Sequence, residues 1–157
     1  MSGAGAPETG NIDGRGLNVV IIAGTWHETI TNGLIAGAER VLNAAQATHR
    51  LVRVPGSFEL AIAAQAAFAG GADAVVALGV IIRGGTPHFE YVAAATTDGL
   101  TRVSLDAGKP VGFGVLTLDD EQQGLDRAGI EGSKEDKGAE AADAALRTAL
   151  LTRELRG

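Results

Sequence analysis

The sequence predicts an α/β protein, a three-layer αβα sandwich built around a four-stranded parallel sheet, with an additional helix at the C-terminus. Two observations lead to this fold class. Short β-branched or apolar runs alternate with segments whose apolar residues recur at helical spacing. Glycine or proline stands at most boundaries between these segments. Such alternation is typical of a parallel sheet that helices cover on both faces through right-handed crossovers.

The first half of the chain predicts two strand–helix pairs. Residues 17–23 are a β-branched run that ends at a glycine, and residues 28–47 carry apolar side chains at helical spacing. Residues 49–54 alternate as a short strand and stop at a Pro-Gly pair. Residues 59–69 are an alanine-rich helix that two glycines close.

The second half predicts two more pairs and the terminal helix. Residues 74–82 are the longest apolar run and predict the fully buried central strand, with a helix over 87–107 behind it. Residues 111–116 predict the fourth strand. The helix expected over 119–128 opens with acidic residues, as the helix dipole prefers. Residues 137–155 predict an amphipathic last helix.

Length and composition indicate where the protein works. The 157 residues predict one domain over residues 15–157, preceded by a flexible arm over residues 1–14 that is rich in glycine. A net charge of −6 gives no basic footprint for nucleic acid. No apolar stretch reaches the ~20 residues of a membrane span, and the N-terminus lacks the features of a signal peptide. The absence of cysteine suits a reducing compartment. We therefore expect a cytoplasmic protein that binds neither nucleic acid nor membrane.

The turn after the central strand is the strongest candidate for a functional site. Gly84 and Gly85 free the backbone, and Thr86 precedes a helix start, so main-chain N–H groups and a hydroxyl are available to an anion such as phosphate. His88 follows at the carboxyl end of a parallel strand, where such sheets bind ligands. Its ordinary pKa near neutrality suits acid–base work. The alternative for His88 is a polar first-turn residue without a function.

Of the six aromatic residues, four follow the carboxyl ends of predicted strands: Trp26, Phe58, Phe89 and Tyr91. Trp26 follows the first strand and Phe58 the second, and both lie in turns beside glycine, so stacking on a ligand is at least as good an interpretation as packing. For Phe68, Phe89 and Tyr91 we expect packing of a helix on the sheet.

The sequence indicates neither a metal nor a cofactor. His27, His49 and His88 lack the spacing of a metal cluster, and there is no cysteine. We expect His27 to cap a helix and His49 to begin a strand on the surface. No phosphate-binding lysine loop is present, and no Gly-x-Gly-x-x-Gly follows the first strand.

Arg127 and Phe113 are expected at the opposite edge of the sheet from His88. A helix over 119–128 would run antiparallel to the strands and carry Arg127 to the far edge, and Phe113 stands near the start of the fourth strand. A strand of five or six residues spans ~17–20 Å. Either residue could therefore serve a site beside His88 only from a neighbouring subunit. The alternative for Arg127 and Lys137 is a solvated cation beside a helix end.

Together these residues resemble the 6,7-dimethyl-8-ribityllumazine synthase family over nearly the whole chain, from about Leu17 to Arg156. The matching segments, in order, are residues 26–27, 54–59, 77–84, 86–92, 113–117, 125–129 and 135–138. The resemblance implies a flavodoxin-like fold. This sequence departs from that of many members at Trp26, where they carry Phe, and at residues 118–120. We expect the second departure to alter only the start of a helix.

The resemblance also implies a role for each matching residue. His88 corresponds to the catalytic histidine that shuttles protons. The ribitylaminouracil substrate would be bound by Trp26, Ser57, Phe58, Glu59, Val80, Ile81, Ile82 and, from the adjacent subunit, Phe113. The butanone phosphate substrate would be bound by Gly85, Thr86, Arg127 and Lys137.

The reaction that the resemblance implies joins 5-amino-6-(D-ribitylamino)uracil to 3,4-dihydroxy-2-butanone 4-phosphate, with release of phosphate and water. It is the penultimate step of riboflavin biosynthesis and needs no cofactor or metal. The linker over residues 129–136 is longer than in family members that build icosahedral cages, so we expect a homopentamer; association with riboflavin synthase is a further implication. Two alternatives stay open, a non-catalytic carrier of flavin or lumazine and a shell protein with a vestigial site.

Overall fold

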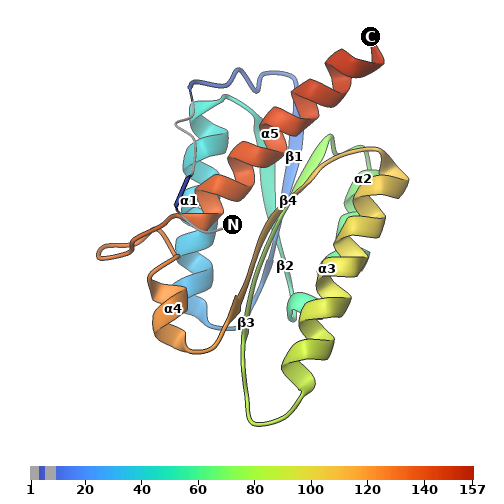
Figure 1. Cartoon of the computed structure of the whole chain (residues 1–157). Helices are drawn as coiled ribbons and strands as arrows, with labels where there is room; N and C mark the ends of the chain where they lie inside the picture. The colour runs from blue at the N-terminus through green and yellow to red at the C-terminus, as the bar shows by residue number, and fades with distance from the viewer. Residues whose placement is uncertain (1–3, 6–9) are drawn as a thin grey trace.

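The computed structural model describes residues 4–5 and 10–157 and shows a four-stranded parallel sheet between two layers of helices (Figure 1). The strands follow the order β2-β1-β3-β4. Their bounds are β1 Asn18–Gly24, β2 Thr48–Val54, β3 Ala74–Ile82 and β4 Val111–Leu118. The helices are α1 Glu28–Ala44, the 3-10 turn η1 Ser57–Glu59, α2 Leu60–Ala69, α3 His88–Ala107, α4 Glu121–Leu125 and α5 Lys137–Arg156. The predicted α/β sandwich with a C-terminal helix is confirmed.

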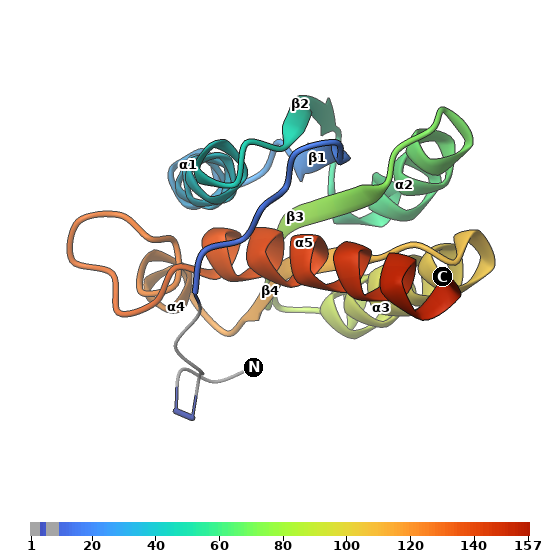
Figure 2. The same ribbon diagram turned by 90° about the horizontal axis from the view of Figure 1, so that it is seen from above.

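Each face of the sheet carries its own apolar core. Helices α1 and α5 cover one face, and α2 and α3 cover the other (Figure 2). The central strand β3 contributes to both cores, because Val76 points to the first and Val75 to the second. Burial on both faces explains why this strand is a continuous apolar run rather than an alternating one.

Helices α1 and α5 approach closely because a glycine stands at their crossing. A Cβ atom added to Gly138 would collide with the main-chain carbonyl of Leu34. Gly138 therefore lets the start of α5 lie against the middle of α1. This contact fixes where the chain between α4 and α5 runs, on the α1 face of the sheet.

The helix predicted over residues 119–128 is wrong in its length. Helix α4 stops at Leu125, because the carbonyl of Asp126 accepts hydrogen bonds from the main-chain N–H groups of Lys134 and Glu135, at 2.8 and 2.9 Å. These bonds bring the linker back onto the end of the helix and prevent a further turn. Sequence spacing alone does not reveal a partner eight or nine residues away.

The helix predicted over residues 28–47 ends early, at Ala44. Gln46 adopts a left-handed conformation with φ of 59°, and the N–H of Ala47 bonds back to the carbonyl of Leu42 at 3.0 Å. This is the geometry of a helix C-terminus that normally uses glycine. The remaining boundaries differ from those predicted by at most two residues.

The N-terminal segment from residue 10 onwards runs beside α1 and α5. Gly14 donates a hydrogen bond to the carbonyl of Ala45 at 2.7 Å, and Arg147 donates one to the carbonyl of Gly10 at 2.7 Å. The predicted flexible arm falls in part on residues 1–3 and 6–9, which lie outside the described residues, so it stays a prediction. Within the described ranges, none of the helices is long and apolar enough to cross a membrane.

Candidate active site

Strands β1, β2 and β3 bring most of the predicted site residues to one edge of the sheet. Gly24 and Val54 are neighbours in the register at the ends of β1 and β2. Trp26 follows the first of these ends, and η1 follows the second. The loop after β3, at the lower end of the sheet in Figure 1, leads to His88 at the start of α3. Because the strands are parallel, all three ends lie on the same side.

Strand β3 projects beyond β1 and leaves backbone groups available to a ligand. The pairing of β1 with β3 ends at Ala23 and Leu78, so in the described part of the chain no strand covers the β1 side of residues 80–82. The side chains of Val80 and Ile81 are buried in opposite cores. The main-chain N–H and C=O groups on the β1 side of this segment are open to a ligand, which suits hydrogen bonding to a flat heterocycle.

The two aromatic residues predicted to stack on a ligand are both exposed at this edge. Trp26 and Phe58 each leave 66% of their surface accessible. The indole of Trp26 lies beside Gly56, and the hydroxyl of Thr25 donates to the carbonyl of Pro55 at 2.7 Å. The turns after β1 and β2 are therefore tied together.

We call the part of this edge formed by Trp26, η1, residues 80–82 and the turn before His88 the shelf. Three residues beside its aromatic rings differ in how they are held. Ser57 is buried, and its hydroxyl lies so close to Gly79 that a side chain there would collide with it. Glu59 is half-buried at the end of η1. His27 stands at the N-cap position of α1, as expected, but its side chain makes no capping hydrogen bond and its φ is 54°.

The turn after β3 is open to solvent. Residues 84–86 and His88 are exposed, and a Cβ on Gly84 or Gly85 would meet open space. Neither glycine adopts a positive φ, in contrast to our expectation that they free the backbone. Nothing within the described chain demands glycine at either position.

Phe113 lies on the face of the sheet that α3 covers, far from this edge. It pairs with Ala77, five residues before the end of β3, which places it about 17 Å from the carboxyl edge. Its neighbours Gly112 and Gly114 face α5, so its own side chain points to the other face, where 47% of it is exposed. The expected separation of Phe113 from His88 is present in the structure.

Arg127 is not at the far edge of the sheet, and the expectation that a long helix carries it there is wrong. Because α4 is short, the chain turns back early, and the carbonyl of Ala128 lies against Gly33 on the second turn of α1. Arg127 therefore sits behind the sheet, on the α1 face, whereas His88 begins α3 on the other face. Its Nη1 donates to the carbonyl of Gln123 at 2.8 Å. The sheet itself, rather than its length, separates Arg127 from His88.

Lys137 begins α5 and is engaged with carboxylates. Its Nζ lies 3.1 Å from an oxygen of Glu135 and 2.9 Å from one of Glu140, and only 12% of the side chain is exposed. Burial lowers the pKa of Lys137, but its hydrogen bonds to Glu140 and Glu135 outweigh burial and raise the pKa above its ordinary value. Its ammonium is thus paired with two carboxylates of the same subunit.

Two residues that sequence reasoning missed tie this edge together. Arg83, directly after β3, pairs with Glu90 and with Asp119. Thr96, buried in α3, donates to the carbonyl of Ser57 at 3.2 Å. For Arg83, the only indication in the sequence was a charged residue at the end of an otherwise apolar strand. For Thr96, there was no indication in the sequence.

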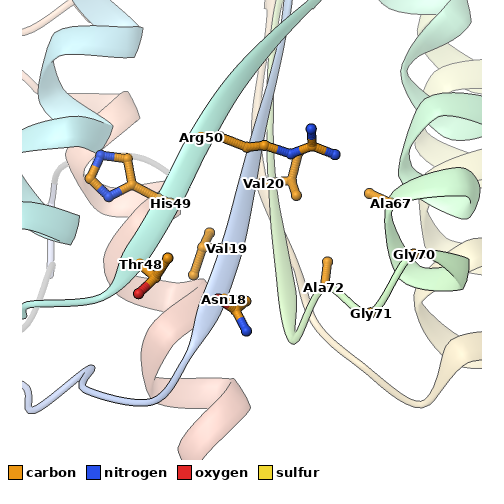
Figure 3. Close-up of a pocket in the computed structure, with 10 residues that line it drawn as sticks. All are labelled: Asn18, Val19, Val20, Thr48, His49, Arg50, Ala67, Gly70, Gly71 and Ala72. Carbon is orange, nitrogen blue, oxygen red and sulfur yellow. The ribbon is translucent and has the colours of Figure 1, made fainter.

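Two hollows of the subunit lie elsewhere. One of about 300 Å³ opens at the amino ends of β1 and β2, beside Asn18, His49 and Gly71 (Figure 3). Another, of about 320 Å³, lies between the last turns of α2 and α3, beside Phe68 and Lys109. Neither includes the residues around His88, which stand exposed at the carboxyl edge of the sheet. Among the described residues there is also no group of three or more His, Asp or Glu placed to hold a metal.

The fold is an α/β sandwich whose carboxyl sheet edge carries exposed aromatic rings, an exposed glycine turn and a histidine, and it is at this edge that open parallel sheets bind ligands. A family model described as 6,7-dimethyl-8-ribityllumazine synthase matches residues 16–153. Proteins of that name are similar to this chain: one from Leifsonia xyli subsp. xyli is 74% identical over the whole of both chains, and one from Clavibacter michiganensis subsp. michiganensis is 67% identical over all of this chain and 99% of its own. One from Nocardioides sp. is 60% identical over 99% of this chain and 97% of its own. The chain belongs to the 6,7-dimethyl-8-ribityllumazine synthase family, and the resemblance found in the sequence is confirmed.

Proposed function

We propose that this protein condenses 5-amino-6-(D-ribitylamino)uracil with 3,4-dihydroxy-2-butanone 4-phosphate to give 6,7-dimethyl-8-(D-ribityl)lumazine, with release of phosphate and water. This is the penultimate step of riboflavin biosynthesis. Membership of the family over nearly the full chain supports the reaction. The observation that carries it in the structure is the common edge that holds Trp26, η1, the open backbone of residues 80–82 and His88. A non-catalytic carrier is not favoured.

The shelf suits the ribitylaminouracil substrate. We assign the indole of Trp26 to stacking on the pyrimidine ring and the open main chain of residues 80–82 to its polar edge. Ser57, Phe58 and Glu59 are assigned to the ribityl chain and the ring. Aromatic faces stack on flat heterocycles, and unpaired backbone groups give such a ring its orientation.

His88 is assigned to proton transfer. The 5-amino group attacks the ketone to form a carbinolamine, which loses water to give an imine. Phosphate then leaves by elimination, and the ribitylamino nitrogen closes the ring with loss of water. Each step moves a proton, which an imidazole can accept and return. Holding the two substrates together supplies a further part of the rate.

The phosphate is assigned to the turn after β3 and to a neighbouring subunit. Gly85 and Thr86 offer N–H groups and a hydroxyl close to the first turn of α3. Phe113 lies far from this turn along β4, and Arg127 lies on the opposite face of the sheet from His88, so we assign both to the site of the adjacent subunit. A guanidinium suits the departing phosphate because its fork binds two oxygens. Lys137 would act near the phosphate only as part of its cluster with Glu135 and Glu140.

A site shared between subunits requires a closed homo-oligomer, and we propose a homopentamer. The expected native mass is about 80 kDa, five chains of 15.9 kDa. A mass that corresponds to sixty chains would contradict the pentamer. The cytoplasmic location and an association with riboflavin synthase stay predictions.

The two-substrate assay tests the reaction. Mixing both substrates with the protein should produce lumazine absorbance well above the uncatalysed background. His88→Ala should slow turnover and spare binding of the uracil, whereas His49→Ala, at the other end of the sheet, should match the wild type. Arg127→Ala should mainly raise the KM of the phosphate substrate. Tight riboflavin binding without turnover would instead indicate a carrier.

A further inference from the structure

Arg83 joins three elements at the active edge. Its Nε lies 3.0 Å from Asp119 Oδ1, in the turn between β4 and α4, and its Nη1 lies 3.0 Å from Glu90 Oε1, in the first turn of α3. Its guanidinium also lies over the ring of Phe89, with Cζ 4.4 Å from the ring centroid. The N–H of Arg83 donates to the carbonyl of Leu118 at 2.8 Å, which anchors its own backbone.

The side chain of Arg83 holds a segment that is otherwise exposed. Residues 84–88 are accessible to solvent, and α3 begins only at His88. Phe89 and Glu90, which follow His88 directly, are the two residues that Arg83 contacts on α3. The contact with Phe89 and the bond to Glu90 therefore set the first turn of α3 relative to the end of β3.

The charges of this cluster also matter for an anionic substrate. Glu90 and Asp119 place two carboxylates beside the turn that carries Gly85 and Thr86. Hydrogen bonds to Asp119 and then to Glu90 raise the pKa of Arg83, so its guanidinium stays charged throughout the working pH range. Without it, both carboxylates would repel a phosphate that approaches the turn.

We propose that Arg83 is a positioning residue, which fixes His88 and the phosphate-binding turn by clamping the start of α3 to the turn between β4 and α4. This rests on the proposed function, because the roles of His88 and the turn belong to it. The clamp needs the planar fork of arginine, since one side chain bonds two carboxylates in different elements and covers an aromatic face. A lysine ammonium offers a single point charge and cannot reproduce all three contacts.

The test measures kcat and both KM values for Arg83→Met, Arg83→Lys and Asp119→Asn. Arg83→Met should lower kcat about tenfold to a hundredfold and raise the KM of the phosphate substrate, because small displacements of a catalytic group are costly. The KM of the ribitylaminouracil should change less than about twofold, since Trp26 and η1 are untouched. Arg83→Lys should restore only part of kcat, and Asp119→Asn should fall between the wild type and Arg83→Met. If Arg83→Met does not fold, the kcat and KM values of Arg83→Lys and Asp119→Asn test the proposal.

The matched control is Arg102→Met, which removes an exposed arginine of α3 whose ion pair has a single partner, Asp106, at 3.5 Å. It should keep the wild-type kcat. Wild-type kcat in Arg83→Met would overturn the proposal, and so would an equal loss in kcat and in binding of the uracil. A wild-type protein without turnover would refute the proposed function instead. In that case the His88 ring signal in a ¹H–¹³C spectrum still tests whether Arg83 positions His88. The proposal requires that signal to shift in Arg83→Met and not in Arg102→Met.

Discussion

The hydroxyl of Thr96, in α3, donates a hydrogen bond of 3.2 Å to the main-chain carbonyl of Ser57, at the start of η1. Both residues are buried. The bond ties the helix that begins with His88 to the segment assigned to the ribitylaminouracil. It therefore links α3 to η1 through a contact that does not involve Arg83.

Thr96→Val should therefore cost both stability and substrate binding. Valine has the shape of threonine but removes one of the two donors to the buried carbonyl of Ser57, which also accepts from the N–H of Leu60, so the loss costs about 1 kcal/mol of unfolding free energy. The KM of the ribitylaminouracil should rise with it. Urea unfolding at a fixed protomer concentration measures the first effect. Thr97→Val is the control, because the Thr97 hydroxyl is exposed and bonds only within its own helix; a loss of equal size there would contradict the expectation.

The strands were predictable because their patterns are local. The apolar run of β3 marked both of its ends correctly, since a strand buried on both faces leaves no polar residue inside it. Helix α4 was not predictable in length. Its end depends on the bonds from Lys134 and Glu135 to the carbonyl of Asp126, and these depend on how a polar linker folds back.

The sequence predicts those parts of the site whose positions follow from the parallel topology alone. The carboxyl ends of β1, β2 and β3 must share an edge, so the order of strands and helices in the sequence is enough to bring Trp26, η1 and His88 together. Arg83 was not predictable, because its partner Asp119 lies 36 residues away in the chain. The position predicted for Arg127 was wrong, because it followed from a helix over residues 119–128 that the chain does not form in full.

Gly138→Ala should destabilise the protein more than an ordinary helix substitution. Alanine favours a helix over glycine by about 1 kcal/mol, but here the added Cβ would meet the carbonyl of Leu34, a backbone atom that cannot rotate away. Forcing α5 away from α1 should lower the unfolding free energy by about 3 kcal/mol. Denaturant unfolding checks this, with Gly10→Ala as the control, because a Cβ at Gly10 meets nothing within 4 Å. A more stable Gly138→Ala variant would show that the two helices can move apart freely.

Asp136→Ala should weaken the start of α5. The carboxylate of Asp136 caps this helix by accepting from the N–H of Ala139 at 3.1 Å, and it pairs with Arg40 of α1 at 2.5 Å. Loss of such a cap costs about 1–2 kcal/mol. Asp136→Asn should retain much of the capping contribution, which separates the cap from the ion pair. Glu131→Ala, in the same linker and exposed, should change the unfolding free energy by less than about 0.5 kcal/mol.

Asp13 should titrate well below an ordinary aspartate. Hydrogen bonds from the side chain and the N–H of Arg15 lower the pKa of Asp13 from 3.8 to about 2. Because the folded pKa is lowered, the pair favours the folded chain above about pH 3.8, and this contribution is lost as the pH falls through about 2. The carboxyl carbon shift of Asp13 followed against pH gives the midpoint. Arg15→Gln should move it towards 3.8, because only the main-chain hydrogen bond remains, and an unchanged midpoint would exclude the Arg15 side chain as the cause.

Lys137→Met distinguishes a structural ammonium from one that binds phosphate. Removing it deprives Glu135 and Glu140 of their shared cation at the start of α5, which should cost about 1–3 kcal/mol of unfolding free energy. The raised pKa keeps Lys137 charged from neutral pH to above its ordinary 10.5, so its contribution should persist through that range and vanish only beyond it. If the cluster also serves the phosphate, the KM of the butanone phosphate should rise alongside, as it does in Arg127→Ala. A destabilised variant with an unchanged KM would assign Lys137 to the fold alone, and unchanged stability with a raised KM would contradict the structural role.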